Sequence, residues 1–323
     1  MSTKSRTTTS ILTAAGAALA ITGVALMSPL ASAQGSIHDN GNGDGIEGNS
    51  GGSTSPAQIT LTGIVRDFRE RNDSSGNGHP DFERRPSSGF GHYMGNIEAE
   101  LDENFKPVFS GEGAKVNRQW KDSAGRPIHP SLYDPSLGDS AGAWGSDDSG
   151  GIDSASSFAQ WFRDTPGKNM SKPLDITLVR QPNSNVYVFD DRQDPFYQNR
   201  GGFFPINNDL FLNSSGDNKN FHFTYELQTE FVYEANSGQI FTFNGDDDVW
   251  VFIDGRCVID IGGVHGRTEQ TVDLDRLDWL DDGGVYRLSF FFAERHRTQS
   301  NFRVETTLQL RAAALPTVAG MAD

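Results

Sequence analysis

The segment that decides the fold runs from Phe243 to Gly266 and reads FNGDDDVWVFIDGRCVIDIGGVHG. Two apolar runs, VWVFI and RCVIDI, flank the pair Asp254-Gly255. An Asp-Gly pair between apolar runs is a strong signal for a two-residue turn, because both turn residues take positive φ angles. The segment therefore predicts a β-hairpin.

Alternation of apolar and polar residues predicts more strands around this hairpin. The expected strands are 59–68, 174–179, 185–190, 221–233, 286–292 and 302–310. Residues 72–218 are otherwise rich in Gly, Pro, Ser, Asp and Asn, and one short helix is expected over 154–163. Many strands with one apolar face each predict an all-β fold, a β-sandwich with long loop-rich insertions.

Three consecutive carboxylates, Asp246, Asp247 and Asp248, lie directly before the hairpin. At about 6 Å and an effective dielectric of about 20, each pair repels by roughly 3 kcal/mol before solvent screening. A loop packed between strands keeps much of that repulsion unless a cation is bound. Oxygen ligands on a loop suit Ca²⁺, and the sequence has no thiolate or paired-histidine pattern for zinc or copper. A solvated acidic turn is the alternative.

The same segment resembles the hallmark of fibro-slime domains, which are similar to PA14 domains. The resemblance extends in order over roughly 59–310. It includes ITLTGIVRDF (59–68), HPDFE (79–83), FAQWFRDTPGKNM (158–170), FFPIN (203–207), FHFTYELQTEF (221–231) and FFAERH (291–296). It implies a PA14-like β-sandwich and a surface protein linked with adhesion to polysaccharide. It names no catalytic residue.

In sugar-binding PA14 members, two consecutive aspartates joined by a cis peptide hold a Ca²⁺ ion that binds sugar hydroxyls. The matching pair here is Asp246-Asp247, and Asp248 stands where many PA14 sequences have Gly. A later loop completes the calcium site in such lectins, which implies Asn301 first and Glu294 second.

The expected metal ligands are Asp246, Asp247, Asp248, Asn301 and Glu294. The expected contacts to a glycan are Asp246, Asp247, Trp250, His265 and His296. Open alternatives are that His265 is a structural histidine and that Glu294 pairs with Arg295. Asp191 is expected to have no part in calcium binding.

Four parts of the chain are expected. Residues 1–33 carry Lys4, Arg6, an apolar run and an Ala31-Ser32-Ala33 cleavage pattern, which is typical of a secretory signal peptide. Residues 34–56 are expected to form a flexible Gly/Ser/Asn linker, 57–311 the fibro-slime domain, and 312–323 a disordered tail. These boundaries predict a secreted or cell-surface protein with no membrane contact after cleavage.

The net charge of the chain limits the kinds of molecule that it is expected to bind. The chain has 43 acidic and 27 basic residues, a net charge of −16, which becomes −18 without Lys4 and Arg6. Such a surface repels nucleic acid and anionic lipid. The expected function is a calcium-dependent module that binds an extracellular glycan or polysaccharide, not an enzyme. The alternatives are a structural surface protein in which calcium only braces a loop, and a polysaccharide-active enzyme.

Overall fold

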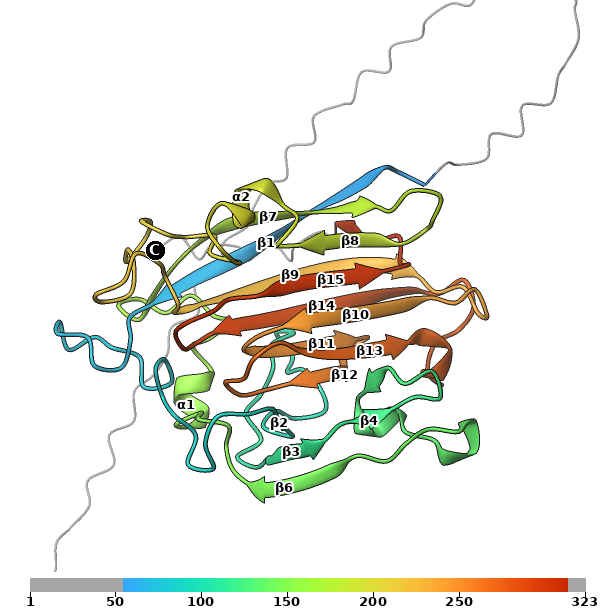
Figure 1. Cartoon of the computed structure of the whole chain (residues 1–323), viewed down its shortest axis with the longest axis horizontal. Helices are drawn as coiled ribbons and strands as arrows, with labels where there is room; N and C mark the ends of the chain where they lie inside the picture. The colour runs from blue at the N-terminus through green and yellow to red at the C-terminus, as the bar shows by residue number, and fades with distance from the viewer. Residues whose placement is uncertain (1–54, 313–323) are drawn as a thin grey trace, which may run out of the picture. The chain divides into compact units, whose positions relative to one another are not determined.

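The computed structural model describes residues 55–312 and consists mainly of antiparallel β-sheet (Figure 1). The expectation of an all-β fold is confirmed. The expected signal peptide (1–33), nearly all of the expected linker (34–56) and nearly all of the expected tail (312–323) lie outside the described residues. Within 55–312 no helix is long and apolar enough to cross a membrane.

One sheet dominates the fold. Its strands are β1 (Gln58–Phe68), β7 (Asn169–Arg180), β8 (Tyr187–Asp190), β9 (Phe223–Val232), β10 (Ile240–Gly245), β11 (Asp248–Ile253), β12 (Arg256–Ile261), β13 (Thr268–Asp273), β14 (Val285–Glu294), β15 (Phe302–Thr306) and β16 (Arg311–Ala312). The hydrogen-bonded order is β12-β11-β14-β9-β1-β7-β8-β15-β10-β13, and β16 pairs with β9.

The sheet folds back on itself, so that its two halves pack face to face around an aromatic core. The Phe290 ring of β14 lies 5.6 Å from the Phe243 ring of β10, and Phe292 lies 5.2 Å from Phe302 of β15. The end strands also meet, because Gln270 Oε1 of β13 accepts a hydrogen bond of 2.9 Å from the Asp260 N–H of β12. The sandwich is therefore nearly closed.

The predicted hairpin is confirmed as β11 and β12, with Asp254 and Gly255 at φ angles of 53° and 79°. The predicted strand 302–310 ends earlier, at Thr306. The predicted helix is shorter than expected: α1 spans Ala155–Phe158 and continues as tight turns. The other helices are α2 (Pro195–Gln198) and the 3-10 turns Pro130–Leu132, Pro135–Leu137 and Leu274–Arg276.

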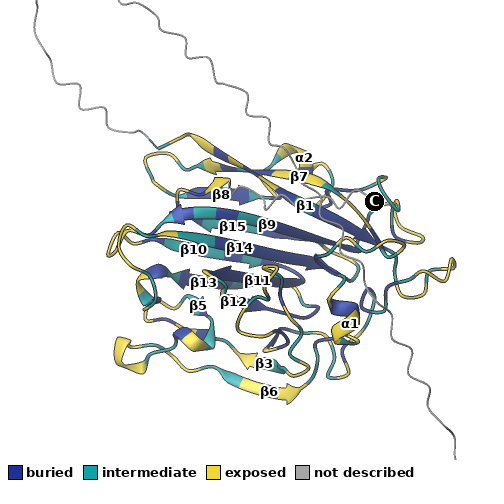
Figure 2. Ribbon diagram, turned by 180° about the vertical axis from the view of Figure 1, so that it is seen from behind, coloured by how far each residue is buried: buried dark blue, intermediate teal, exposed yellow. Residues whose placement is uncertain are grey.

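The insertion between β1 and β7 covers the outer face of the sheet. It contains a three-stranded sheet of β2 (Tyr93–Met94), β3 (Ala114–Arg118) and β6 (Ala143–Asp147), and a pair of β4 (Trp120–Lys121) and β5 (Pro127–Ile128). Trp161 and Phe162 pack there with Trp250, Phe252 and Phe291 in a second apolar cluster. The central strands β9, β11 and β14 are therefore largely buried on both faces, while the residues of β3 and β6 are all intermediate or exposed (Figure 2).

Candidate functional site

Strand register brings two chain reversals to the same end of the sandwich. Gly245 of β10 is paired with Phe302 of β15, and Asp248 of β11 is paired with Ala293 of β14. The two-residue link Asp246-Asp247 therefore lies against the segment 295–301. The Asp246–Asp247 peptide is cis, as the resemblance implied.

Asp246 is 2% exposed and is held by Asn301. The backbone N–H of Asn301 donates to Asp246 Oδ1, and its side-chain Nδ2 donates to Asp246 Oδ2 at 2.7 Å. The side-chain oxygen of Asn301 accepts from Arg192 Nη2 at 2.9 Å. In this orientation Asn301 positions the carboxylate of Asp246, and the bond from Arg192 uses one of the two lone pairs of its side-chain oxygen.

Asp248 forms a buried ion pair with Arg295. Arg295 Nε and Nη2 donate to the two carboxylate oxygens of Asp248 at 2.5 and 3.1 Å, and the Gly263 N–H adds a third bond at 2.6 Å. Asp248 is 1% exposed and Arg295 is 0% exposed. The same guanidinium donates to the Gly150 carbonyl at 2.8 Å, which ties the insertion to the site. Because its charge is compensated, we leave Asp248 out of the proposed ligand set.

Asp247 and Glu294 have no such cation. Asp247 accepts only backbone N–H groups among the hydrogen bonds of the described residues, from His265 and Arg295, both at 3.2 Å. Glu294 is 0% exposed, and neither of its carboxylate oxygens has a partner at full hydrogen-bond geometry within 55–312, although the Ser300 hydroxyl and the His296 backbone N–H lie beside it. Burial raises the pKa of Glu294 well above its ordinary value, and the carboxylates of Asp247 and Asp246 raise it further.

A hollow of about 240 Å³ opens beside these groups. Its lining residues are Phe90, Asp246, Asp247, Val264, His265, Gly266, His296, Arg297, Thr298 and Gln299. The Phe90 ring is 43% exposed and lies 4.7 Å from the His296 ring. His265 and His296, two of the expected glycan contacts, line this hollow. Trp250 does not, and its assignment as a ligand contact is corrected: it is 0% exposed, and its indole N–H is bonded to Asp260 in the core.

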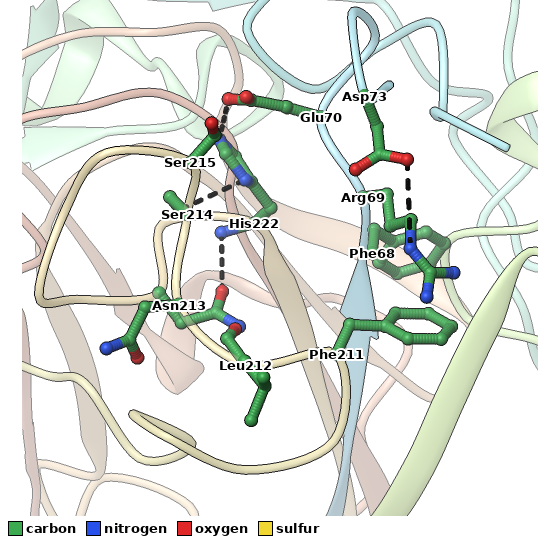
Figure 3. A pocket seen from close by; sticks show the side chains of 11 residues that line it. Phe68, Arg69, Glu70, Asp73, Phe211, Leu212, Asn213, Ser214, Ser215 and His222 are labelled. Carbon is green, nitrogen blue, oxygen red and sulfur yellow. Dashed lines mark hydrogen bonds and ion pairs between the residues drawn. The ribbon is translucent and has the colours of Figure 1, made fainter. Parts of the chain in front are cut away.

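A second cluster was not identified from the sequence. One ligand atom each from Glu70, Glu83 and His222 lies within 4.8 Å of the others, a spacing that could hold a metal ion. Glu70 and His222 line a hollow of about 160 Å³ (Figure 3). The cluster is already compensated, because Arg297 donates to Glu83 at 2.8 Å and to Glu70 at 2.7 Å. Among residues 55–312 no other such group meets this spacing, Asp246, Asp247 and Glu294 included.

Comparison with known proteins gives relatives for about half of the chain. No protein-family model matches it. Protein psiQ of Dictyostelium discoideum is 37% identical over 172 residues, which are 49% of this chain and 16% of psiQ. Protein psiD is 38% identical over 170 residues, 50% of this chain and 31% of psiD, and psiE is 34% identical over 173 residues, 49% of this chain and 32% of psiE.

The chain is homologous to the psi proteins. The match spans less than a third of the length of each of these psi proteins. The resemblance to the fibro-slime and PA14 family is confirmed by this homology.

Solved structures similar to this psi homologue are remote. A PA14 sugar-binding domain from an RTX adhesin matches with 10% identity, 76% of this chain, 87% of that chain and a TM-score of 0.23. The PA14 domain of the antifreeze protein MpAFP matches with 11% identity, 30% of this chain, 56% of that chain and a TM-score of 0.22. Similarity at this level carries no functional argument.

Proposed function

We propose that the chain is a calcium-dependent glycan-binding module that acts outside the cell. The observation that carries the proposal is Glu294: a fully buried carboxylate that pairs with no cationic side chain among the described residues, next to Asp246 and Asp247. A buried charge is tolerated when it is paired or bound to a metal. The adjacent cation, Arg295, is bonded to Asp248.

Calcium fits the donor set. Asp246, Asp247 and Glu294 offer only oxygen atoms, and Ca²⁺ takes six to eight oxygen ligands in flexible geometry. At about 6 Å and an effective dielectric of about 20, each carboxylate pair would repel by roughly 3 kcal/mol, which a divalent cation would reverse. We propose these three residues as the ligands, with Asn301 holding Asp246.

The adjoining hollow supports a sugar as the outer ligand. Bound calcium would offer open coordination positions to a pair of hydroxyl groups. The exposed Phe90 ring at the rim would pack against the apolar C–H face of a sugar. The burial of Asp246 and Asp247, 2% and 3% exposed, instead favours the second candidate, a calcium ion that only braces the loop.

The first experiment is thermal unfolding in calcium and in EDTA. Extracellular calcium modules bind with Kd values of about 10⁻⁴–10⁻³ M, and calcium at about 100 times Kd would add roughly 2.7 kcal/mol. We expect Asp247→Asn to abolish this gain, while Asp278→Asn, at an exposed turn, keeps it. An unchanged Tm of the wild-type chain in EDTA would exclude the calcium site.

The second experiment separates the two candidates. A glycan array is probed in calcium and in EDTA. Sugar binding that EDTA removes supports the glycan-binding module, whereas calcium stabilisation without sugar binding supports the bracing role. Turnover of a polysaccharide would instead support an enzyme. The extracellular location rests on the pattern in residues 1–33, and N-terminal sequencing that finds Gln34 first would support it.

A further inference from the structure

A separate hollow of about 280 Å³ lies on the other side of the segment 299–301. Its lining residues are Asp191, Arg192, Gln198, Gly201, Gly202, Gln299, Ser300 and Asn301. Arg192, Gln198 and Gln299 form an exposed polar rim, and the buried residues Asp191, Ser300 and Asn301 lie beneath it. The volume is close to the lower end of ligand pockets, about 300 Å³. It suits a small molecule or one unit of a longer one.

Two residues that line this hollow each have a buried side-chain oxygen without a well-formed hydrogen bond within the described residues. Asp191 is 1% exposed; its Oδ1 accepts from the Phe302 N–H at 3.0 Å, but its Oδ2 has no hydrogen bond. Ser300 is also 1% exposed, and its hydroxyl, which lies beside the Glu294 carboxylate, makes no hydrogen bond of full geometry among these residues. A buried polar atom without a hydrogen-bond partner is unfavourable, because it has lost its bonds to water. Burial also raises the pKa of Asp191 to about 6.

The lining residues define the chemistry of the occupant. Asp191 Oδ2 needs a donor, the Ser300 hydroxyl can donate or accept, and the rim adds two amides and a guanidinium. No apolar side chain lines the hollow. One carboxylate and one guanidinium balance each other, so the site does not select strongly for charge. A neutral molecule with adjacent hydroxyl groups meets all of these requirements.

The hollow is connected to the proposed calcium site through two residues. Gln299 lines both hollows. Asn301 lines this hollow and donates to Asp246 at 2.7 Å on the other side, while Arg192 donates to its oxygen. An oligosaccharide bound at Asp246 and Asp247 could therefore place its next unit beside Asp191.

We propose that the hollow lined by Asp191, Gln299 and Ser300 is a second subsite, which binds the neutral sugar unit next to the one held at the calcium site. This proposal rests on the proposed function. It gives the module a preference for oligosaccharides over single sugars, set by residues that do not touch the cation.

The test is isothermal titration of the full chain in calcium with paired sugars. The probes are the methyl glycosides of mannose, glucose and galactose, each with the corresponding disaccharide: mannobiose, maltose and galactobiose. We expect one disaccharide to bind about tenfold or more tightly than its methyl glycoside. Asp191→Asn and Ser300→Ala should each reduce that ratio to within about twofold. Asp278→Asn should retain it.

The measurements distinguish a failure of the second subsite from a failure of the proposed glycan-binding function. Equal affinities of the wild-type chain for a disaccharide and its methyl glycoside would overturn the second subsite alone, as would a ratio that both variants leave intact. No binding of any probe would overturn the glycan-binding function as well. The calcium-induced rise in Tm, measured on each variant, verifies that the first site is intact. If Asp191→Asn does not fold, Ser300→Ala decides.

Discussion

Glu294 and Asp248 show how neighbouring acids acquire different roles. Asp248 is paired with a guanidinium, whereas no guanidinium pairs with Glu294 among residues 55–312. Both are almost fully buried, so partners rather than exposure separate them. Burial also raises the pKa of Asp247 far above its ordinary value, and the carboxylates of Asp246 and Asp248 add to that shift. Without a bound cation, the burial of the Asp247 carboxyl group therefore opposes folding.

This arrangement predicts an unusual pair of outcomes for Glu294→Gln. In EDTA the variant should be more stable than the wild-type chain, because one repelling carboxylate is gone. In calcium it should gain much less stability, because a ligand is missing. Urea unfolding under both conditions measures the two free energies, and Asp278→Asn serves as the control for loss of one charge. A variant less stable than the wild-type chain in EDTA would argue that Glu294 is paired and not a free ligand.

Among the residues of the site, sequence reasoning succeeded where the signal is local. The adjacent aspartates and the Asp254-Gly255 turn are visible in a short window. The partner of Asp248 is 47 residues away, so nothing local indicates that Arg295 neutralises it. The cluster of Glu70, Glu83 and His222 spans an even longer stretch. Asp191, expected to have no part in calcium binding, lines the same hollow as Asn301 and is therefore unsuitable as a control.

At the scale of elements, the alternation of apolar and polar residues in β9 predicts one buried face and one solvent-exposed face. In the structure both faces are buried over much of the strand: Thr224 is 0% exposed and Glu226 is 7% exposed. The polar face is covered by the insertion, and Glu226 is paired there with Lys106 and Arg66. The strands could be predicted because the alternation of apolar and polar residues is visible in a short stretch of sequence. The layer that covers them could not be predicted, because irregular loops have no such alternation.

The junction of β12 and β13 gives a prediction about an element. Gln270 is 0% exposed. Its side-chain oxygen accepts a hydrogen bond from the Asp260 N–H and so joins β13 to β12, the other end strand of the sheet. Gln270→Ala would leave that buried N–H without a partner, which costs about 1–3 kcal/mol. Urea unfolding should show this loss. Thr268→Ala, at the start of the same strand, should change stability much less, and equal losses would argue against a bridging role.

At the scale of the whole molecule, buried histidines link stability to pH. Burial lowers the pKa of His79 to about 4 and that of His92 to about 3, against about 6.5 in an unfolded chain. Between these values the unfolded chain binds more protons than the folded one, so stability falls as the pH drops from about 6.5 towards 4. Burial raises the pKa values of Asp67 and Asp260 to about 7. These two carboxyl groups therefore have the opposite effect, and their contribution to stability increases as the pH falls.

A difference measurement isolates the histidine contribution. His79→Gln should be less stable than the wild-type chain at pH 7, because His79 bonds to the Ser157 carbonyl. The gap should narrow as the pH falls to 4.5, because the variant has no buried imidazole to protonate. The carboxyl groups are the same in both proteins and cancel in the difference. Urea unfolding at pH 7, 6, 5 and 4.5 measures the gap, and a gap of constant size would mean that His79 does not titrate differently on folding.

The insertion anchored by Arg295 has a consequence for how binding preference can change. The aspartates come from the rigid sheet, whereas Phe90 at the rim comes from the insertion. One guanidinium fastens the two parts by its bonds to Asp248 and Gly150. Mutations can therefore accumulate in the rim without disturbing the carboxylates. For protein engineering, we expect a library that varies the loop around Phe90 and keeps the aspartates and Arg295 to change the proposed sugar selectivity without loss of the proposed cation requirement.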